Sequence, residues 1–293
     1  MTMPQPANSS KFLTGLIGAP IAHSASPAMH EQAAAALGLR CHYQLIDVAG
    51  AGPDRLAALL DGVRRLGFAG VNVTYPYKEA VVDLLDDLAP EAAAMGAVNA
   101  VVVRNGRLIG HNTDTTGFAR AAAPLVADSG HGPVALIGAG GVGKAIGFAL
   151  ARLKVGGLRI FDADRVRAAR LATLLRSCQG VMIADSVEQA LQGAVGLVNG
   201  TPVGMLPNRN SPVPDGLLHE GLWVADAVYN PLWTPLLKAA KLKGARVMTG
   251  RELAIYQAAD AFELFTGHAP SVAVMGDAFD HHMAEANSAS HAA

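Results

Sequence analysis

A glycine-rich stretch, "VALIGAGGVGKA" at residues 134–145, is the first place where the residue types suggest chemistry. It fits the pattern G-x-G-x-x-G, follows an apolar run typical of a strand, and opens a segment typical of a helix. In that context the first glycine permits a tight turn, the second lets the backbone approach a pyrophosphate, and the third lets helix and strand pack closely. The positive end of the helix then holds the phosphates. The stretch therefore predicts a dinucleotide site, rather than a glycine-rich turn without a ligand, at Gly138, Ala139, Gly140, Gly141, Val142 and Gly143.

An acid closes the next predicted strand, in "RIFDADR" at residues 159–165. A carboxylate at this distance from the glycines accepts hydrogen bonds from the ribose hydroxyls of NAD and repels the 2′-phosphate of NADP. Asp162 or Asp164 could instead cap the following helix, and Asp164 fits the cap better, which leaves Asp162 for the ribose. Arg165 and Arg167 are close enough in sequence to accept a 2′-phosphate. We expect NAD as the preferred cofactor and NADP as the alternative.

Four polar clusters lie at the ends of predicted strands in the first part of the chain: "HSASP" (23–27), "NVTYPYK" (72–78), "AVN" (97–99) and "GHNTD" (110–114). Ligands of open α/β sheets gather at the carboxyl ends of strands. Removing a hydride from a C–OH group also requires removing the hydroxyl proton, which a lysine beside a carboxylate can relay. Lys78 and Asp114 are the candidates, although Lys78 could be solvated and Asp114 could cap a helix that begins near Thr115. Ser24 and Ser26 could likewise be helix caps, with Ser26 as the N-cap of the helix that follows.

The elements that must position these residues alternate between strands and helices, which predicts an α/β protein with mostly parallel sheets covered by helices on both faces. Strands are expected at 11–18, 41–48, 68–76, 97–103, 107–112, 134–138, 158–162, 181–185, 196–202, 222–229 and 245–250. Helices are expected at 26–39, 53–67, 78–89, 90–96, 117–127, 141–153, 165–175 and 251–267, with a further one after Pro270. Asn105-Gly106 predicts a tight hairpin turn.

Composition excludes several classes of function. Lys and Arg total 23 and Asp and Glu total 24, so no basic excess indicates a nucleic-acid or anionic-membrane partner. Cys41 and Cys178 do not form a disulfide framework, which favours a reducing compartment. The N-terminus lacks the apolar segment of a secretory signal and no apolar run is as long as a membrane span, so we expect a cytoplasmic protein. His281-His282 lacks metal-site spacing, and no metal is expected.

Eight motifs in order make the chain resemble the shikimate dehydrogenases along nearly its whole length: "GAPIAHSASPAMH", "GVNVTYPYKEAV", "GAVNAVV", "GHNTDTTGF", "GAGGVGKA", "NGTPVGM", "DAVYNPLWTPLL" and "YQAADAFELFTG". The resemblance implies an N-terminal α/β substrate domain at 11–115, completed by helices at 251–285. It also implies a Rossmann NAD(P)-binding domain at 116–250 and a deep cleft between the two domains. The implied reaction is the reversible NAD(P)-linked oxidation of shikimate to the 3-dehydro ketone, by a monomer or a homodimer.

The same resemblance implies roles for individual residues. Lys78 and Asp114 form the catalytic pair. The residues implied to hold the substrate carboxylate and hydroxyls are Ser24, Ser26, Thr74, Asn99, Tyr229 and Gln257. Those implied to line the nicotinamide region are Thr201, Val203, Met205 and Gly250.

The chain departs from the family pattern after the second Rossmann strand. NADP-dependent members carry "NRT" there, whose Arg and Thr hold the 2′-phosphate, whereas this chain has "FDADRVR" and resembles the NAD-using quinate/shikimate dehydrogenase branch. In that branch the second serine of the serine motif is often threonine, which favours quinate, whereas Ser26 favours shikimate. The alternatives are a dual quinate/shikimate enzyme, an NADP-dependent shikimate dehydrogenase, an enzyme for an amino analogue, and a catalytically silent NAD-binding sensor.

Overall fold

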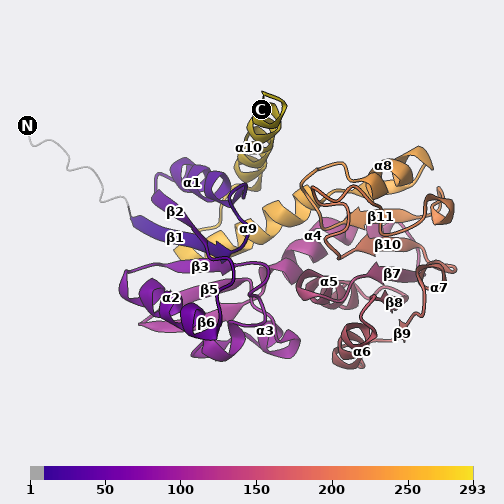
Figure 1. Ribbon diagram of the computed structural model, residues 1–293, viewed down its shortest axis with the longest axis horizontal. Helices are drawn as coiled ribbons and strands as arrows, with labels where there is room; N and C mark the ends of the chain where they lie inside the picture. The colour runs from indigo at the N-terminus through magenta and orange to yellow at the C-terminus, as the bar shows by residue number, and fades with distance from the viewer. Residues whose placement is uncertain (1–9, 293) are drawn as a thin grey trace, which may run out of the picture. The chain divides into compact units, whose positions relative to one another are not determined.

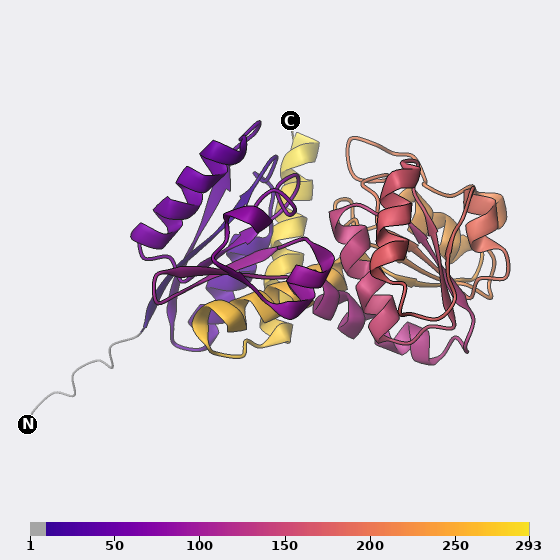
Figure 2. The same ribbon diagram turned by 90° about the horizontal axis from the view of Figure 1, so that it is seen from below.

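The computed structural model describes residues 10–292. The prediction that the N-terminus lacks a secretory signal concerns residues 1–9 in part, and these lie outside the described residues. The chain divides into two compact units (Figures 1 and 2). The first unit contains the residues up to Thr113 and those from Ala258 onward, and the second spans Asp114–Gln257. Both passages between units occur inside helices, namely α4 (Thr113–Ala127) and α9 (Gly250–Thr266). Both units are α/β, as predicted.

The first unit is built on a mixed sheet with strand order β2-β1-β3-β5-β6-β4. Strands β1, β2 and β3 are parallel to one another, and β5 runs antiparallel to both β3 and β6. The strands are β1 (Lys11–Gly18), β2 (Arg40–Asp47), β3 (Gly70–Val73), β4 (Asp87–Leu88), β5 (Ala100–Arg104) and β6 (Arg107–His111). The predicted hairpin turn is confirmed, because Asn105 and Gly106 both adopt positive φ angles, of 52° and 72°.

Alternating side chains of this sheet pack against helices on opposite faces. Val101 belongs to a buried cluster with Leu56 of α2, whereas Ala100 and Val102 pack with Phe265 of α9. This period of two is what a strand covered on both sides requires. The other helices of the unit are α1 (Ser26–Ala36), α2 (Pro53–Arg65), α3 (Pro90–Met95) and α10 (Val272–Ala292).

The second unit has a wholly parallel sheet with strand order β12-β11-β10-β7-β8-β9. The chain starts at the central strand β7, winds outward to one edge, and then returns to lay β10 on the other side of β7. This is the doubly wound Rossmann order, whose switch point lies between β7 and β10. The strands are β7 (Pro133–Ile137), β8 (Gly157–Phe161), β9 (Val181–Ile183), β10 (Gly196–Asn199), β11 (Trp223–Asp226) and β12 (Arg246–Met248).

Helices cover both faces of the second sheet. Leu136 of β7 packs with Phe118 of α4 and Ile146 of α5, and Ile137 packs with Leu236 of α8 on the opposite face. The remaining helices are α5 (Gly141–Arg152), α6 (Arg165–Leu174), α7 (Val187–Leu191) and α8 (Pro235–Leu242). Two of these, α7 and α8, were not among the predicted elements.

The helix predicted at 78–89 is wrong. The segment contains a single 3₁₀ turn, Val82–Leu84, followed by β4, which pairs with β6. The N–H groups of Asp86 and Ala89 donate to the Leu108 and Gly110 carbonyls of β6, at 3.0 and 2.8 Å. These groups bond to the sheet instead of to the preceding turn, so tertiary pairing overrides the helical spacing of the apolar residues.

Two expected caps are also wrong. Ala25, not Ser26, occupies the N-cap position of α1, and no side chain caps that helix. Asp114 lies in the first turn of α4, which begins at Thr113, two residues before the expected start. Pro27 at the start of α1 was predicted correctly.

His30 of α1 lies in the apolar interior of the first unit. Its side chain is 1% exposed, and neither ring nitrogen has a hydrogen-bond partner. The ring centroid lies 4.6 Å from that of Tyr43, 5.8 Å from Phe262 and 6.1 Å from Phe265. Burial without a partner lowers the pKa of His30 to about 3, because the imidazolium would be desolvated. His30 is therefore neutral in the folded protein throughout the neutral range.

This burial predicts an acid-dependent loss of stability. The unfolded chain binds a proton at His30 as the pH falls through about 6.5, and the folded chain does not until about pH 3, so acid stabilises the unfolded state. Where only the unfolded chain binds this proton, the free energy of unfolding falls by ~1.4 kcal/mol for each pH unit of acidification. We expect the parent to lose about 2 kcal/mol more than His30→Leu between pH 7.5 and 5, measured by urea unfolding. Equal pH dependence in the two proteins would contradict a buried neutral His30.

Candidate active site

The glycine turn joins β7 to α5 and has the shape of a phosphate cradle. Gly138 has a φ of +99°, which favours glycine. A Cβ on Gly143 would lie 2.1 Å from the Gly138 carbonyl oxygen, so this glycine permits the close contact of helix and turn. A Cβ on Gly140 would meet nothing within 4 Å. Gly140 is also the N-cap of α5 and has no side-chain cap. The residues present therefore fit a pyrophosphate, which would approach at Gly140.

Asp162, half-buried directly after β8, is bonded to this turn. One of its carboxylate oxygens accepts from the Ala139 N–H at 2.7 Å, and the other accepts from the Asp164 N–H at 2.8 Å. Asp164 is the N-cap of α6 and accepts from the Val166 N–H at 3.0 Å, so the predicted Asp164 cap is confirmed. Each oxygen of Asp162 retains a further lone pair with which it can accept from a ribose hydroxyl.

The two arginines beside Asp162 each have an acidic partner. Arg165 pairs with Asp185, and the Arg167 Nε lies 3.3 Å from an Asp164 oxygen. Both ion pairs are exposed, so each contributes little to stability. To bind either arginine, however, a phosphate would have to displace the carboxylate that is paired with it.

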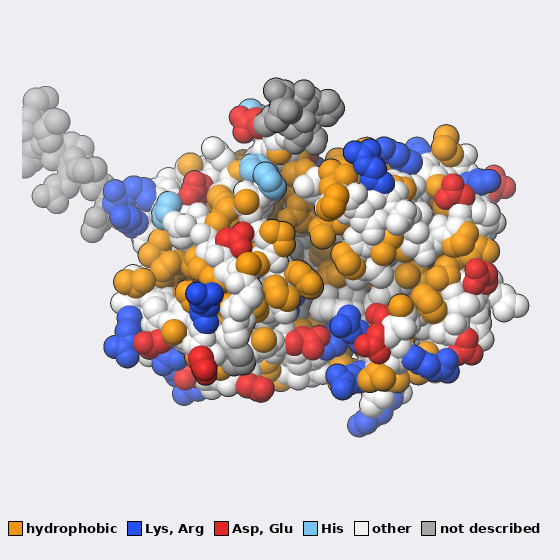
Figure 3. Space-filling model, viewed as in Figure 1, with side chains coloured by type: hydrophobic (Ala, Val, Ile, Leu, Met, Phe, Trp, Pro, Cys, Tyr) orange, Lys and Arg blue, Asp and Glu red, His pale blue; other side chains and the backbone are white. Residues whose placement is uncertain are grey.

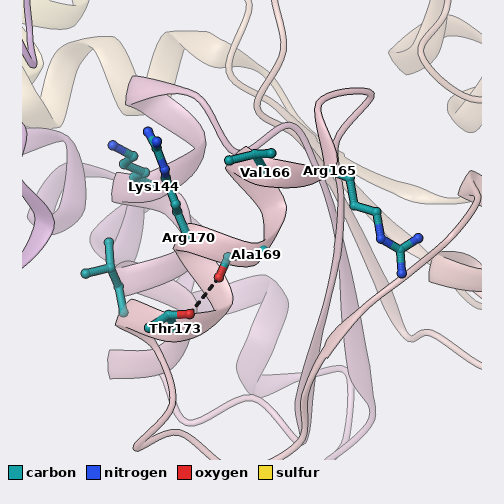
Figure 4. A pocket seen from close by; sticks show the side chains of 7 residues that line it. Lys144, Arg165, Val166, Ala169, Arg170 and Thr173 are labelled. Atoms are coloured by element: carbon teal, nitrogen blue, oxygen red, sulfur yellow. Dashed lines mark hydrogen bonds between the residues drawn. The ribbon is translucent and has the colours of Figure 1, made fainter.

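A groove of about 640 Å³ lies between α5 and α6 (Figure 4). Lys144 and Arg170 extend on one side of it, whereas Arg165 projects away from them. The lining residues are Lys144, Arg165, Val166, Ala169, Arg170, Thr173 and Leu174. Of the residues singled out in the sequence, only Arg165, a candidate acceptor of a 2′-phosphate, lines this groove.

The segment after β10 packs on the glycine turn. A Cβ on Gly138 would lie 2.6 Å from the Thr201 side chain, and one on Gly200 would lie 3.0 Å from the Gly143 Cα. Thr201 and Val203, predicted to line the nicotinamide region, therefore lie in a segment that contacts the dinucleotide cradle at the switch point of the sheet. Met205 follows in the same segment, and its side chain is exposed.

A buried polar cluster beneath this segment was missed by the sequence analysis. Asn199 and Asp226 are opposite each other in the register of β10 and β11, and both are fully buried. Asp226 accepts from Asn199 Nδ2 and the Val228 N–H, both at 2.9 Å, and from Thr234 Oγ1 at 2.7 Å. Burial raises the pKa of Asp226 to about 6, and the three donors oppose that shift. A single acid inside the apolar run "LWVADAV" was the available signal.

Two further predicted residues of the second unit lie near or on α9. A Cβ on Gly250 would lie 2.5 Å from the Val228 carbonyl oxygen, and Gln257 Nε2 donates to the Ala254 carbonyl at 2.9 Å. Tyr229 follows β11 and is half-buried, and burial raises the pKa of its phenol, which keeps the hydroxyl a hydrogen-bond donor.

In the first unit, three of the residues predicted to bind substrate follow strands β1 and β3. The Ser24 hydroxyl donates to the Ser26 hydroxyl at 3.1 Å and accepts from the Ser26 N–H at 3.3 Å, at the start of α1. Thr74 directly follows β3, and a Cβ on Gly18, the last residue of β1, would lie 2.3 Å from its methyl group. Thr74 therefore lies where the neighbouring strands β1 and β3 end.

Two consecutive residues before β5 connect Lys78 to the start of α4. The Val98 N–H donates to the Lys78 carbonyl at 2.8 Å. The Asn99 side chain accepts from the Thr113 N–H at 2.7 Å and donates to the Thr113 hydroxyl at 3.0 Å. Asp114 is the next residue along the chain. Much of the hydrogen-bonding capacity of Asn99 is thus used to anchor the backbone next to Asp114.

Other classes of site find no support in the part of the chain that is described. The described side chains include no group of three His, Cys, Asp or Glu that could hold a metal ion. Among the same residues, no helix is long and apolar enough to cross a bilayer. On the face in Figure 3, outside the grey residues, acidic and basic side chains are interspersed.

The turn geometry predicts opposite effects for two alanine substitutions. Gly140→Ala adds a methyl group in open space, so the thermal unfolding temperature should stay within about 2 °C of the parent. That methyl lies where the pyrophosphate would approach, and we expect at least ~10-fold weaker dinucleotide binding by calorimetry. Gly143→Ala forces a backbone shift and should cost ~1–3 kcal/mol of stability. Undiminished dinucleotide binding by Gly140→Ala would rule out the cradle.

Comparison with known proteins supplies the family. Residues 16–101 match the family model described as "Shikimate dehydrogenase substrate binding domain", and residues 250–278 match "Shikimate 5'-dehydrogenase C-terminal domain". The chain is 46% identical over 266 residues to the shikimate dehydrogenase (NADP(+)) of Streptomyces avermitilis, covering 88% of this chain and 91% of the relative. It is 43% identical over 283 residues to the quinate/shikimate dehydrogenase (NAD(+)) of Corynebacterium efficiens, covering 93% and 99%.

The chain is also similar to a solved structure over nearly its whole length. The quinate dehydrogenase of Corynebacterium glutamicum, in complex with NAD, matches with a TM-score of 0.86 and 39% identity, over 94% of this chain and 100% of the other. The motifs, the Rossmann order of the second sheet and these similarities lead to one conclusion. The chain belongs to the shikimate dehydrogenase family, a family of oxidoreductases.

Proposed function

We propose that this protein catalyses the reversible oxidation of shikimate to 3-dehydroshikimate and prefers NAD to NADP. The observation that carries the cofactor preference is the Asp162 carboxylate, which is bonded to the glycine turn at Ala139 where a dinucleotide ribose would lie. The relatives include both NADP and NAD enzymes, so the preference rests on this chain's own residues.

Three consecutive residues support NAD. Asp162, Ala163 and Asp164 belong to the segment "FDADRVR", which follows the second Rossmann strand in the region where NADP-dependent members of the family carry "NRT", whose Arg and Thr hold the 2′-phosphate. Two carboxylates flank the position, and a carboxylate beside a phosphate is repelled electrostatically. Arg167 is paired with Asp164. The surroundings of Asp162 thus favour two ribose hydroxyls over a 2′-phosphate.

The cofactor would be held by backbone N–H groups of the glycine turn at its pyrophosphate and by Asp162 at its ribose. The residues after β10, Thr201, Val203 and Met205, together with Gly250, would surround the nicotinamide. When bound, the cofactor supplies the hydride acceptor for the oxidation.

The substrate would be held by neutral hydrogen-bonding groups. Ser24 and Ser26, whose hydroxyls are 3.1 Å apart, would bind the carboxylate together with the protonated phenol of Tyr229. Thr74, Asn99 and Gln257 would bind the ring hydroxyls. Ser26 favours shikimate, because the quinate-using branch often carries threonine there. A dual quinate/shikimate activity is the second candidate, and the similarity to the NAD-dependent quinate/shikimate relative favours it.

Lys78 and Asp114 would carry out the proton transfer. Lys78 would bind the hydroxyl that becomes the ketone, and Lys78 and Asp114 together would accept and relay its proton as the hydride passes to the cofactor. The Val98 bond to the Lys78 carbonyl and the Asn99 bond to the Thr113 N–H support the proposal, because they anchor the backbone at Lys78 and next to Asp114. A catalytically silent sensor would have been free to lose either one.

We also infer a reducing, cytoplasmic location. Cys41 and Cys178 are both free in the structure, and the family acts on a small polar molecule rather than on a membrane or a nucleic acid.

Replacing Lys78 tests the catalytic assignment. Lys78→Ala should lower kcat for shikimate oxidation by ~10²-fold or more, because the proton relay is lost. The dissociation constant for NAD should stay within about twofold, since Lys78 belongs to the first unit. The exposed neighbour substitution Glu79→Ala serves as the control and should retain kcat. Turnover by Lys78→Ala at the parent rate would remove Lys78 from the mechanism.

Restoring the NADP pattern tests the cofactor assignment. The triple variant Asp162→Asn, Ala163→Arg, Asp164→Thr removes two carboxylates and adds one exposed arginine, while Thr can still cap α6. We expect the ratio of kcat/KM for NADP to that for NAD to rise by ~10²-fold or more. Asp164→Thr alone, which keeps Asp162, should change the ratio less than tenfold. A ratio unchanged in the triple variant would contradict the role of Asp162.

A further inference from the structure

Asp226 is the one acid of the second sheet whose side chain is fully buried, and the proposed chemistry does not use it. It lies at the end of β11, level in register with Asn199 of β10, next to the switch point of the sheet. Three groups donate to its carboxylate: Asn199 Nδ2, the Val228 N–H and Thr234 Oγ1. The first two share the oxygen Oδ1, and Thr234 donates to Oδ2. These three donors satisfy the buried carboxylate. Because its oxygens can accept but not donate, the group that faces Asn199 is a hydrogen-bond acceptor.

That constraint fixes the orientation of the Asn199 amide. An amide can present either its NH₂ group or its oxygen to a neighbour, and Asp226 Oδ1 can pair only with the NH₂ group. The amide oxygen must then face the opposite way, toward Thr201, where it accepts from the N–H at 3.0 Å and from the hydroxyl at 2.7 Å. Reversing the amide would set its oxygen against the Asp226 oxygen and its NH₂ group against two donors.

The oriented amide also fixes the rest of the segment. Asn199 Nδ2 donates a second hydrogen bond to the Val203 carbonyl at 3.1 Å. The Thr201 hydroxyl, which donates to Asn199, accepts from the Val203 N–H at 3.1 Å. Residues 199–203 therefore form a connected set of hydrogen bonds, and those to Val203 O, Thr201 N and Thr201 Oγ1 depend directly on which way the Asn199 amide points.

We propose that Asp226 is a positioning residue for the cofactor, which acts through Asn199 to hold residues 200–205 in the conformation that contacts the nicotinamide end of the dinucleotide. The proposal rests on the proposed function, because that function assigns Thr201 and Val203 to the cofactor site. If Asp226 acts in this way, any side chain at residue 226 that directs an oxygen acceptor at Asn199 should preserve its role.

The chain offers variants that separate this role from general stability. Asp226→Ala removes the acceptor, and Asn199→Ala removes the amide while leaving Asp226 its bonds from Val228 and Thr234. Asp226→Asn is the conservative variant, because its amide oxygen can still accept from Asn199 and Val228. Thr234→Val is the matched control, because it removes only the bond to Oδ2 and the cap of α8 and keeps the side-chain shape.

Two measurements test the proposal. Hydrogen exchange of residues 200–205, without cofactor, should be at least tenfold faster in Asp226→Ala and Asn199→Ala than in the parent, Asp226→Asn and Thr234→Val. The dissociation constant for NAD⁺ should rise about tenfold in the first two variants and stay within about threefold in the others. Should Asp226→Ala not fold, Asn199→Ala carries the same prediction.

The outcomes are distinct. Parent-like exchange and parent-like NAD⁺ affinity in Asn199→Ala would overturn the proposal, as would equal losses in Thr234→Val and Asp226→Ala. A parent protein that binds neither NAD⁺ nor NADP⁺ would refute the proposed function, while the exchange rates would still test whether Asp226 orders residues 200–205.

Discussion

The contact between Gly143 at the start of α5 and the carbonyl of Gly138 is the constraint on which the Rossmann unit depends. A single methyl group at Gly143 would come within 2.1 Å of that oxygen. Because the contact is possible, α5 begins directly above the carboxyl end of β7, and its N–H groups face the space beside Gly140. The same closeness lets Gly200 pack on Gly143, which brings the ends of β7 and β10 together at the switch point.

Two carboxylates lie at this edge of the sheet. Asp162 is half-buried and is held by two backbone N–H groups, where the proposed function places a ribose. Asp226 is fully buried and faces the protein instead of solvent. In our proposals, the first acid favours NAD over NADP, and the second keeps the neighbouring segment in place.

The sequence predicted those features that depend on local spacing. The alternation of strands and helices, the glycine turn, the hairpin at Asn105-Gly106 and the Asp164 cap were all found, because each depends on residues that are near one another along the chain. The false helix at 78–89 shows the limit, since its N–H groups bond to β6, which lies further along the chain. The pairing of Asn199 with Asp226 was missed for a related reason. It depends on strand register, and no local pattern in "NGTPVGM" or "LWVADAV" specifies which residues face each other. The substrate and catalytic roles came from motif resemblance and await experiment.

The proposed oxidation of shikimate with NAD is tested by measuring kcat/KM for shikimate and quinate, each with NAD⁺ and NADP⁺, on one preparation of the parent protein. We expect the highest kcat/KM for shikimate with NAD⁺ and at least a ~10-fold lower value for shikimate with NADP⁺, the size expected from one unfavourable charge contact. A higher kcat/KM with NADP⁺ would contradict the role given to Asp162, and no turnover of either substrate would contradict the assigned reaction.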